Sequence, residues 1–255
     1  MTEDVVYWWL IRGFLALAIV TFPALFFFAA PYGRHAEASR LPTINARLGW
    51  LLMEAPSALV PFFCFLVGDH RSDPARLALL FLWELHYVHR AFVFPFRLKK
   101  GARPMAISVP AAAFFFTSVN GYLNGRWLFH FAPADAYGAA WLLDPRFVVG
   151  AVMFLAGYAV NQQADKILLD LRKPGETGYK IPRGGLYRFV SCPNYLGEII
   201  EWTGFAIASW SLPGLVFALW TTANLLPRAV AHHRWYREKF ADYPPERRAL
   251  IPFLL

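Results

Sequence analysis

The chain has 255 residues, of which 57% are hydrophobic, 18% are aromatic and only 16% are charged. This length has room for one or two soluble domains, but the composition excludes an ordinary soluble protein and indicates an integral membrane protein. The net charge of +8 is spread between apolar stretches. It therefore favours anionic lipid head groups or a polyanionic cofactor over nucleic acid as a partner.

Seven apolar stretches approach or exceed the ~20 residues that a membrane-spanning helix needs. They cover residues 7–30, 48–67, 75–96, 105–131, 146–165, 195–210 and 212–229. The last two are short and are separated only around Ser211, so six spans with one re-entrant segment is an alternative count. We predict an all-α integral membrane protein with seven transmembrane helices.

The basic residues predict how these helices are oriented. Nineteen of the 25 Lys and Arg residues fall in the alternate segments 31–47, 97–104, 166–194 and 228–255. Because Lys and Arg concentrate on the cytoplasmic side of a membrane, these four segments are predicted to be cytoplasmic. The N-terminus is then outside and the C-terminus is cytoplasmic.

The longest polar passage runs from Leu171 to Trp202 and reads L-R-K-P-G-E-T-G-Y-K-I-P-R-G-G-L-Y-R-F-V-S-C-P-N-Y-L-G-E-I-I-E-W. It is basic and glycine-rich, so its backbone can wrap closely around a ligand. It contains neither a G-x-G-x-x-G turn after a strand nor a G-K-[ST] loop, which excludes Rossmann and P-loop nucleotide sites.

Three predicted helices carry polar stripes at the same membrane side. The stripes consist of Asn161 with Asp165, Asn194 with Glu198, and Arg228 with His232 and Tyr236. Their convergence predicts a polar pocket, although unrelated interfacial residues remain the alternative. Carboxylates can accept hydrogen bonds from ribose hydroxyls and arginines can bind phosphates, so the mixture favours a nucleotide cofactor.

Two further polar groups lie deeper in the predicted spans. An acidic side chain at the depth of Glu54 costs free energy in a membrane, so we hypothesise a functional role for it. The other explanation is a simple pairing with a neighbouring His or Arg. Tyr87 lies at similar depth on the adjacent antiparallel helix, where it could also be an ordinary buried tyrosine. A protonated Glu54 and Tyr87 sharing one acceptor would polarise a carbonyl oxygen, as conjugate reduction of an enone requires.

No metal site is expected. Cys64 lies in a span and Cys192 lies on the predicted cytoplasmic side, so the two cysteines indicate neither a disulfide nor a thiolate metal site. His86 and His89 share a polar helix face with Arg90, but no further ligand set accompanies them.

The chain also resembles a known family, the membrane-bound steroid 5-alpha-reductases, or 3-oxo-5-alpha-steroid 4-dehydrogenases, and its bacterial-type members. The resemblance is closest in L-R-K-P-G-E-T-G-Y-K-I-P-R-G-G-L-Y, N-Y-L-G-E-I-I-E-W, A-S-W-S-L-P, H-H-R-W-Y and D-Y-P-P-E-R-R-A-L-I-P-F-L-L. It continues more weakly through H-Y-V-H-R and M-E-A-P-S, and so covers most of the chain. It implies a seven-helix fold, NADPH as the hydride donor, and reduction of the 4,5 double bond of a 3-oxo-4-ene steroid.

The resemblance also implies roles for individual residues. Glu54 and Tyr87 would hold the 3-keto oxygen as catalytic residues, and Trp50 and Met53 would line the substrate site. The residues expected around NADPH are Arg103, Asn161, Asp165, Arg172, Tyr179, Asn194, Glu198, Arg228, His232 and Tyr236. Met53 is a departure, because the steroid enzymes usually have glutamine there, and it makes a different enone lipid more credible as the substrate.

We therefore expect a single membrane-embedded reductase domain over residues 1–255. Residues 1–131 would line a lipid substrate chamber and residues 146–255 would form the NADPH site. The protein would be a monomer in a bacterial inner membrane or in the endoplasmic reticulum, in contact with membrane lipids and not with nucleic acid. Alternatives are a reductase of another lipid enone or polyprenoid, an isoprenylcysteine-type methyltransferase, or a transporter that uses Glu54 as a proton site.

Overall fold

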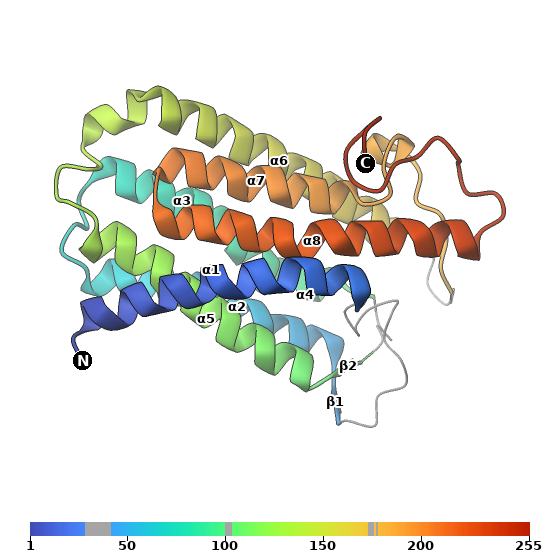
Figure 1. Ribbon diagram of the computed structural model, residues 1–255, viewed down its shortest axis with the longest axis horizontal. Coiled ribbons are helices and arrows are strands. Elements are labelled where there is room, and N and C mark those ends of the chain that lie inside the picture. The colour runs from blue at the N-terminus through green and yellow to red at the C-terminus, as the bar shows by residue number, and fades with distance from the viewer. Residues whose placement is uncertain (29–41, 100–103, 173–175, 177) are drawn as a thin grey trace.

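The computed structural model describes residues 1–28, 42–99, 104–172, 176 and 178–255. Long α-helices lie side by side along one axis (Figure 1). In chain order they are α1 Glu3–Phe27, α2 Ala46–Val67, α3 Pro74–Val88, α5 Ser108–Arg126, α6 Pro145–Asp170, α7 Pro193–Ser209 and α8 Leu212–Lys239. The short helix α4 Phe94–Arg97 lies between α3 and α5 in the chain. Two short strands, β1 Thr43–Ile44 and β2 Met105–Ala106, pair antiparallel.

Where the structure describes them, the seven predicted apolar stretches are largely helical, but several ends differ from the prediction, and residues 105 and 106 form the strand β2. The helices α6 and α8 continue to Asp170 and Lys239, beyond the predicted ends at residues 165 and 229. Polar residues can extend a helix beyond its apolar part, because the backbone hydrogen bonds continue unchanged. Among the described residues, four helical segments are long and apolar enough to cross a membrane: Glu3–Phe27, Ala46–Val67, Pro74–Arg97 and Pro145–Asp170. The expected seven spans therefore stay a prediction.

The stretches 195–210 and 212–229 belong to two separate helices, α7 and α8, that run back along each other (Figure 1). Trp210 adopts a left-handed backbone conformation with φ 44°, and Ser211 Oγ accepts a hydrogen bond from the backbone N–H of Gly214. These two features end α7 and start α8 within a very short turn.

The predicted helix over residues 75–96 is interrupted. A π-helical turn, His89–Val93, separates α3 from α4, and a second one, Trp127–Phe131, extends α5. Pro95 lacks a backbone N–H, so the regular hydrogen-bond pattern cannot pass through this point. The wider turn changes the direction in which the side chains of His89 and Arg90 leave the helix.

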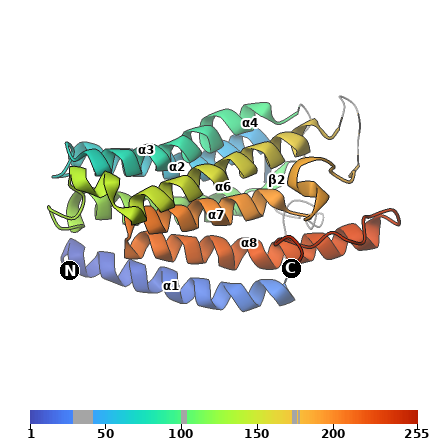
Figure 2. The ribbon, with the colours of Figure 1, turned by 90° about the horizontal axis from the view of Figure 1, so that it is seen from above.

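The helices α6 and α7 approach unusually closely because glycines face backbone across their interface. A Cβ on Gly157 would lie 2.4 Å from Glu201 N, and a Cβ on Gly204 would lie 2.5 Å from Phe154 N. Small residues allow such close approach of helices in a membrane. Figure 2 shows α7 between α6 and α8, so α7 has a neighbouring helix on each side.

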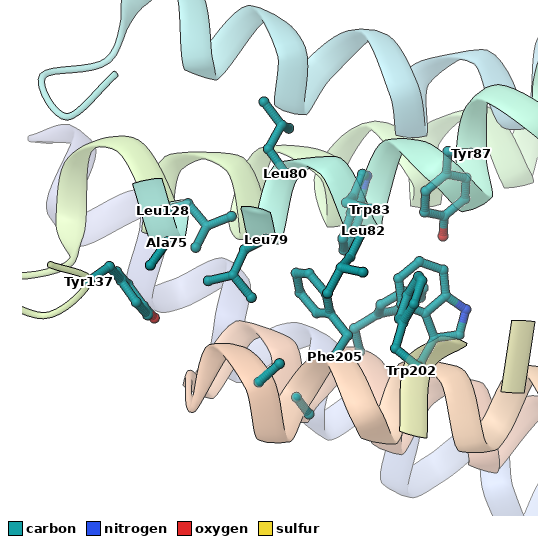
Figure 3. Packing of buried hydrophobic residues seen from close by; sticks show 14 of the residues in the cluster. Ala75, Leu79, Leu80, Leu82, Trp83, Tyr87, Leu128, Tyr137, Trp202 and Phe205 are labelled. Carbon is teal, nitrogen blue, oxygen red and sulfur yellow. The ribbon is translucent and has the colours of Figure 1, made fainter. Parts of the chain in front are cut away.

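Aromatic side chains fill the centre of the bundle. Trp83 and Tyr87 of α3 face Trp202 and Phe205 of α7 (Figure 3). Trp83 Nε1 donates a hydrogen bond of 2.7 Å to the carbonyl of Ser57 on α2. That carbonyl is available because Pro61, four residues later, has no N–H to donate.

The segments predicted to be cytoplasmic gather at one end of the bundle where the structure describes them. The β1–β2 ladder joins the start of α2 to the start of α5, and Figure 1 shows it at the same end as the start of α7 and the C-terminus. The N-terminus lies at the other end. Which end faces the cytoplasm stays a prediction.

Asp144, at the start of α6, caps the helix and binds Arg146. Its carboxylate accepts hydrogen bonds of 2.8 Å from the Arg146 backbone N–H and from its guanidinium. The side-chain hydrogen bonds lower the pKa of Asp144 to about 2, below the ~3.9 of an unfolded chain. Because the pKa is lowered on folding, the ionised carboxylate stabilises the folded state at neutral pH, and this contribution is lost as the pH falls from about 4 to about 2.

We therefore expect Asp144→Ala to melt a few degrees below the parent protein at pH 7. The difference should shrink between about pH 4 and pH 2, where the parent carboxylate becomes protonated. Melting curves followed by circular dichroism in detergent measure it. A difference that stayed constant over this pH range would contradict the assignment.

Candidate active site

Arg90 is the centre of the polar cluster. Its Nη1 donates a hydrogen bond of 2.9 Å to Asp165 Oδ2 on α6, and its Nε lies 3.9 Å from Glu54 Oε1 on α2. The guanidinium also lies over the rings of Trp50, at 4.6 Å, and Phe94, at 4.7 Å. The π-helical turn thus places one mostly buried cation between carboxylates from two other helices.

Two of the three predicted polar stripes converge directly. Asn194 Nδ2 on α7 donates to Asp165 Oδ1 at 3.2 Å, and Asn161 Nδ2 on α6 donates to the Asn194 carbonyl at 3.1 Å. The close packing of α6 against α7 brings these groups within reach of one another. The predicted meeting of the stripes on these two helices is confirmed.

Glu198 lies one helical turn beyond Asn194 and faces the same cluster. It is partly buried and interacts electrostatically with Arg90 and with Glu54. The sequence alone assigned Glu198 to a cofactor pocket and Glu54 to a separate catalytic site. In the structure the two carboxyl groups belong to one connected polar region.

Tyr87 is held from two sides by tryptophans. Its ring stacks on Trp202 with centroids 5.2 Å apart and an interplanar angle of 27°, and it lies 5.1 Å from Trp83. Tyr87 is also within electrostatic range of Glu54. The meeting of Glu54 and Tyr87 across α2 and α3 stays a prediction. Figure 3 shows the Tyr87 ring facing Trp202.

A buried His–Glu pair lies beside Tyr87. His86 Nδ1 lies 2.8 Å from Glu201 Oε1, and both side chains are almost fully buried. Within the described residues, Glu201 Oε2 has no hydrogen-bond partner. The His86 ring also packs edge-on against Tyr87 and Trp202. In the sequence His86 is recognisable only as part of a polar helix face, because its partner is determined by the register of α3 against α7.

The third stripe reaches α7 through Tyr195. The Tyr195 hydroxyl lies 3.2 Å from His232 Nε2, and the Arg228 guanidinium lies 5.4 Å from the centre of the Tyr195 ring. Farther along α8, Tyr236 stacks on Tyr243 with centroids 5.3 Å apart. Tyr195, which connects this stripe to α7, was not among the predicted site residues.

The remaining predicted residues lie around this region or in the glycine-rich loop. Arg172 Nη1 donates to the Gly178 carbonyl at 3.4 Å, and Tyr179 is exposed with its ring 4.9 Å from that of Trp235. The Met53 carbonyl accepts a hydrogen bond of 2.9 Å from Thr117. Arg103 lies outside the described residues.

Two glycines of the loop need their conformational freedom. Gly178 and Gly184 have φ of 86° and 92°, a region that side-chain-bearing residues rarely adopt. The wrapping of this loop around a ligand stays a prediction. In the described parts of the chain, no group of three or more His, Cys, Asp or Glu residues is arranged to hold a metal ion.

Together these groups combine two kinds of recognition. Carboxylates, amides and guanidinium groups on α6, α7 and α8 suit a ligand that carries hydroxyls and phosphates. Glu54 and Tyr87 border the same cluster from the aromatic side, where they can donate hydrogen bonds to an acceptor oxygen. A polar ligand and an apolar one could therefore meet beside Arg90.

Comparison with known proteins agrees with this arrangement. Residues 103–255 match the family described as 3-oxo-5-alpha-steroid 4-dehydrogenase. The chain is 45% identical over 242 residues to steroid 5-alpha-reductase DET2 of Gossypium hirsutum, with 93% of each chain covered. It is 46% identical to 3-oxo-5-alpha-steroid 4-dehydrogenase 1 of Mus musculus, covering 96% of this chain and 94% of that one. The human protein of the same name is 44% identical over 88% of this chain and 85% of its own. The chain therefore belongs to the steroid 5-alpha-reductase family of oxidoreductases.

Proposed function

We propose that this protein reduces the 4,5 double bond of a 3-oxo-4-ene steroid, or of a similar enone lipid, with NADPH as hydride donor. The arrangement around Arg90 carries the proposal, because it joins Glu54 to Asp165, Asn194 and Glu198 in one cluster. The relatives named as steroid 5-alpha-reductases support the substrate class.

Glu54 and Tyr87 are the proposed catalytic residues. A protonated Glu54 and the Tyr87 hydroxyl donate hydrogen bonds to the ketone oxygen, and so stabilise the negative charge that develops there as the double bond is reduced. The Trp202 and Trp83 rings hold the Tyr87 ring in place. Trp50, which lies under the Arg90 guanidinium, and Met53 line the substrate side.

The residues of α6, α7 and α8 fit NADPH by their chemistry. Asp165 and Glu198 can accept hydrogen bonds from ribose hydroxyls, and the amide of Asn194 can match a carboxamide. Bound NADPH supplies the hydride for the β-carbon of the enone. The full proposed set is Arg103, Asn161, Asp165, Arg172, Tyr179, Asn194, Glu198, Arg228, His232 and Tyr236.

The proposed placement in the membrane follows from the distribution of charge. All seven long helices cross the bilayer, with the N-terminus outside and the polar end, including the C-terminus, in the cytoplasm. Residues 1–131 line the lipid chamber and residues 146–255 form the cofactor site of one domain. The protein acts as a monomer in a bacterial inner membrane or in the endoplasmic reticulum.

The test is an NADPH oxidation assay on the purified protein with 4-ene-3-one steroids and with polyprenoid enones. We expect NADPH consumption to match formation of the saturated ketone. The two substrate classes are compared because of Met53: its thioether cannot form the hydrogen bonds of the glutamine amide that the steroid enzymes usually have there. Binding of labelled S-adenosylmethionine without NADPH oxidation would instead favour a methyltransferase.

Arg90→Leu tests the polar cluster. Removing the cation leaves Asp165 and Glu54 mostly buried without their shared partner, and a broken buried ion pair costs about 3–5 kcal/mol. We expect the KM for NADPH to rise and the melting temperature to fall.

The matched control is Arg126→Leu. Arg126 pairs with Glu3 through hydrogen bonds of 2.7 and 2.8 Å, in the region of the N-terminus and away from the cluster. Its loss should leave the KM for NADPH unchanged. Equal KM values for the two variants would argue against a cofactor role for the Arg90 cluster.

A further inference from the structure

The C-terminal segment is fixed to the start of α7 as far as Leu250. The Arg248 backbone N–H donates to the Phe189 carbonyl at 2.9 Å, and the Arg248 carbonyl accepts from Ser191 N at 2.9 Å. Cys192 N donates to the Ala249 carbonyl at 3.2 Å, and Ala249 and Leu250 are buried. This part of the chain is therefore an integral piece of the fold.

After Leu250 the backbone folds back on itself. Leu250 N and Ile251 N both donate to the Leu255 carbonyl oxygen at 2.7 Å. Phe253 has φ 65°, a conformation that is strained for a residue with a side chain. A backbone held in an unfavourable conformation indicates that the direction of the side chain is maintained by the surrounding structure.

The segment after Leu250, which folds back on itself, presents apolar side chains outward. Phe253 is 81% exposed and Leu254 is 77% exposed, and the Phe253 ring lies 5.6 Å from that of Phe189. Ile251 is also exposed. We call Phe189, Ile251, Phe253 and Leu254 the apolar tip. Clustered exposed apolar groups commonly mark an interaction surface.

The position of the apolar tip along the bundle axis indicates that its partner is the membrane. Figures 1 and 2 both show the C-terminus level with the end of α1 along the long axis of the bundle. That helix is apolar enough to cross a membrane, and Phe27, at its end, is 82% exposed. The tip therefore lies at the depth where the apolar surface of the helices ends.

Two arginines lie beside the tip. The Arg188 guanidinium lies 5.8 Å from the centre of the Phe189 ring, the Arg248 backbone N–H donates to the Phe189 carbonyl, and both arginine side chains are exposed. Aromatic and aliphatic side chains next to arginines are typical of segments that lie in the membrane interface, where cations meet anionic head groups.

We propose that the apolar tip inserts into the head-group region of the membrane and that the neighbouring arginines bind anionic lipid. The helices cross this same membrane. The anchor would also act on the polar site. Arg248 and Ala249 hold Ser191 and Cys192, and α7, which begins at Pro193, carries Asn194 as its second residue.

The Ser191 contacts extend this connection to α8. Ser191 Oγ lies 2.7 Å from His233 Nδ1 and 2.6 Å from the Tyr243 hydroxyl. The tail, the start of α7 and the end of α8 thus meet at one residue. Anchoring the tip restrains all three segments.

The test is a measurement of depth on the full chain in vesicles of equal parts phosphatidylcholine and phosphatidylglycerol. Leu254→Cys is labelled with an environment-sensitive fluorophore, and Asp242→Cys, in the polar part of the same tail, is the matched control. Cys64 and Cys192 are buried, and the unsubstituted protein measures any label they take up. Nitroxide lipids and aqueous iodide serve as quenchers.

We expect the label at position 254 to be quenched several-fold more by shallow nitroxide lipids than the label at position 242, and several-fold less by iodide. Equal iodide quenching at both positions would overturn the proposal. Protection that disappeared when the protein was diluted among vesicles would also overturn it, because a second copy would then cover the tip. Pure phosphatidylcholine vesicles should reduce the nitroxide quenching at position 254, and unchanged quenching would refute the arginine contribution.

Discussion

Tyr87→Phe should fold normally and lose about 10²–10³-fold in turnover, the loss found when one hydrogen-bond donor to a developing oxyanion is removed. The phenylalanine ring can keep the stacking on Trp202 and the contact with Trp83, so that only the hydroxyl is lost. Single-turnover rates with NADPH and a 4-ene-3-one measure the effect. The KM for NADPH should stay near its parent value, because the hydroxyl belongs to the ketone side of the site.

Glu54→Gln completes this test, since its amide is a poorer donor than a protonated carboxyl group but has nearly the same shape. Its turnover should fall by a similar factor. The matched control is Glu84→Gln, a partly buried glutamate on α3 whose Oε1 has no hydrogen-bond partner within the described residues. If Glu54→Gln and Tyr87→Phe both turned over normally, the two residues would not be the catalytic pair.

Much of the fold could be predicted because long helices of this kind are visible in the sequence as long apolar stretches. Long apolar stretches located all seven helices, and the spacing of Asn161, Asp165, Asn194 and Glu198 correctly indicated that polar faces of α6 and α7 converge. Both patterns depend on residues within one helix. They can therefore be interpreted without knowing which helices are neighbours.

The centre of the site could not be predicted in the same way. The sequence shows Arg90 as a polar residue within an apolar stretch. The direction of its side chain depends on the π-helical turn, which hydrophobic periodicity does not reveal. The His86–Glu201 pair depends on the register of α3 against α7. Register between helices is determined by packing across the bundle, so the sequence gives no direct sign of it.

The glycine contacts between α6 and α7 fix the register of these two helices. Gly150 and Gly157 are seven residues apart on α6, as are Gly197 and Gly204 on α7, so each pair lies on one face after two helical turns. Each glycine faces backbone atoms of the other helix within 3 Å of where a Cβ would be. The contact positions Asn161 beside Asn194, and so it supports the whole polar cluster.

Gly157→Ala should therefore be strongly destabilising, although alanine is the better helix former. The added methyl group would lie 2.4 Å from Glu201 N and 2.5 Å from the Gly197 carbonyl, and neither backbone atom can move without shifting a helix. Overpacking of this kind typically costs about 1–3 kcal/mol or more, which exceeds the ~1 kcal/mol gained in helix propensity. The separation of α6 from α7 should also weaken NADPH binding, because Asp165 and Asn194 would move apart.

The control is Gly13→Ala in α1, where an added Cβ meets no atom within 4 Å. That variant gains helix propensity without a clash, so its melting temperature should equal or exceed that of the parent protein. The two identical substitutions should thus change thermal stability in opposite directions, as measured by melting in detergent. If Gly157→Ala were as stable as Gly13→Ala and bound NADPH normally, the close contact of α6 with α7 would not be what positions the polar cluster.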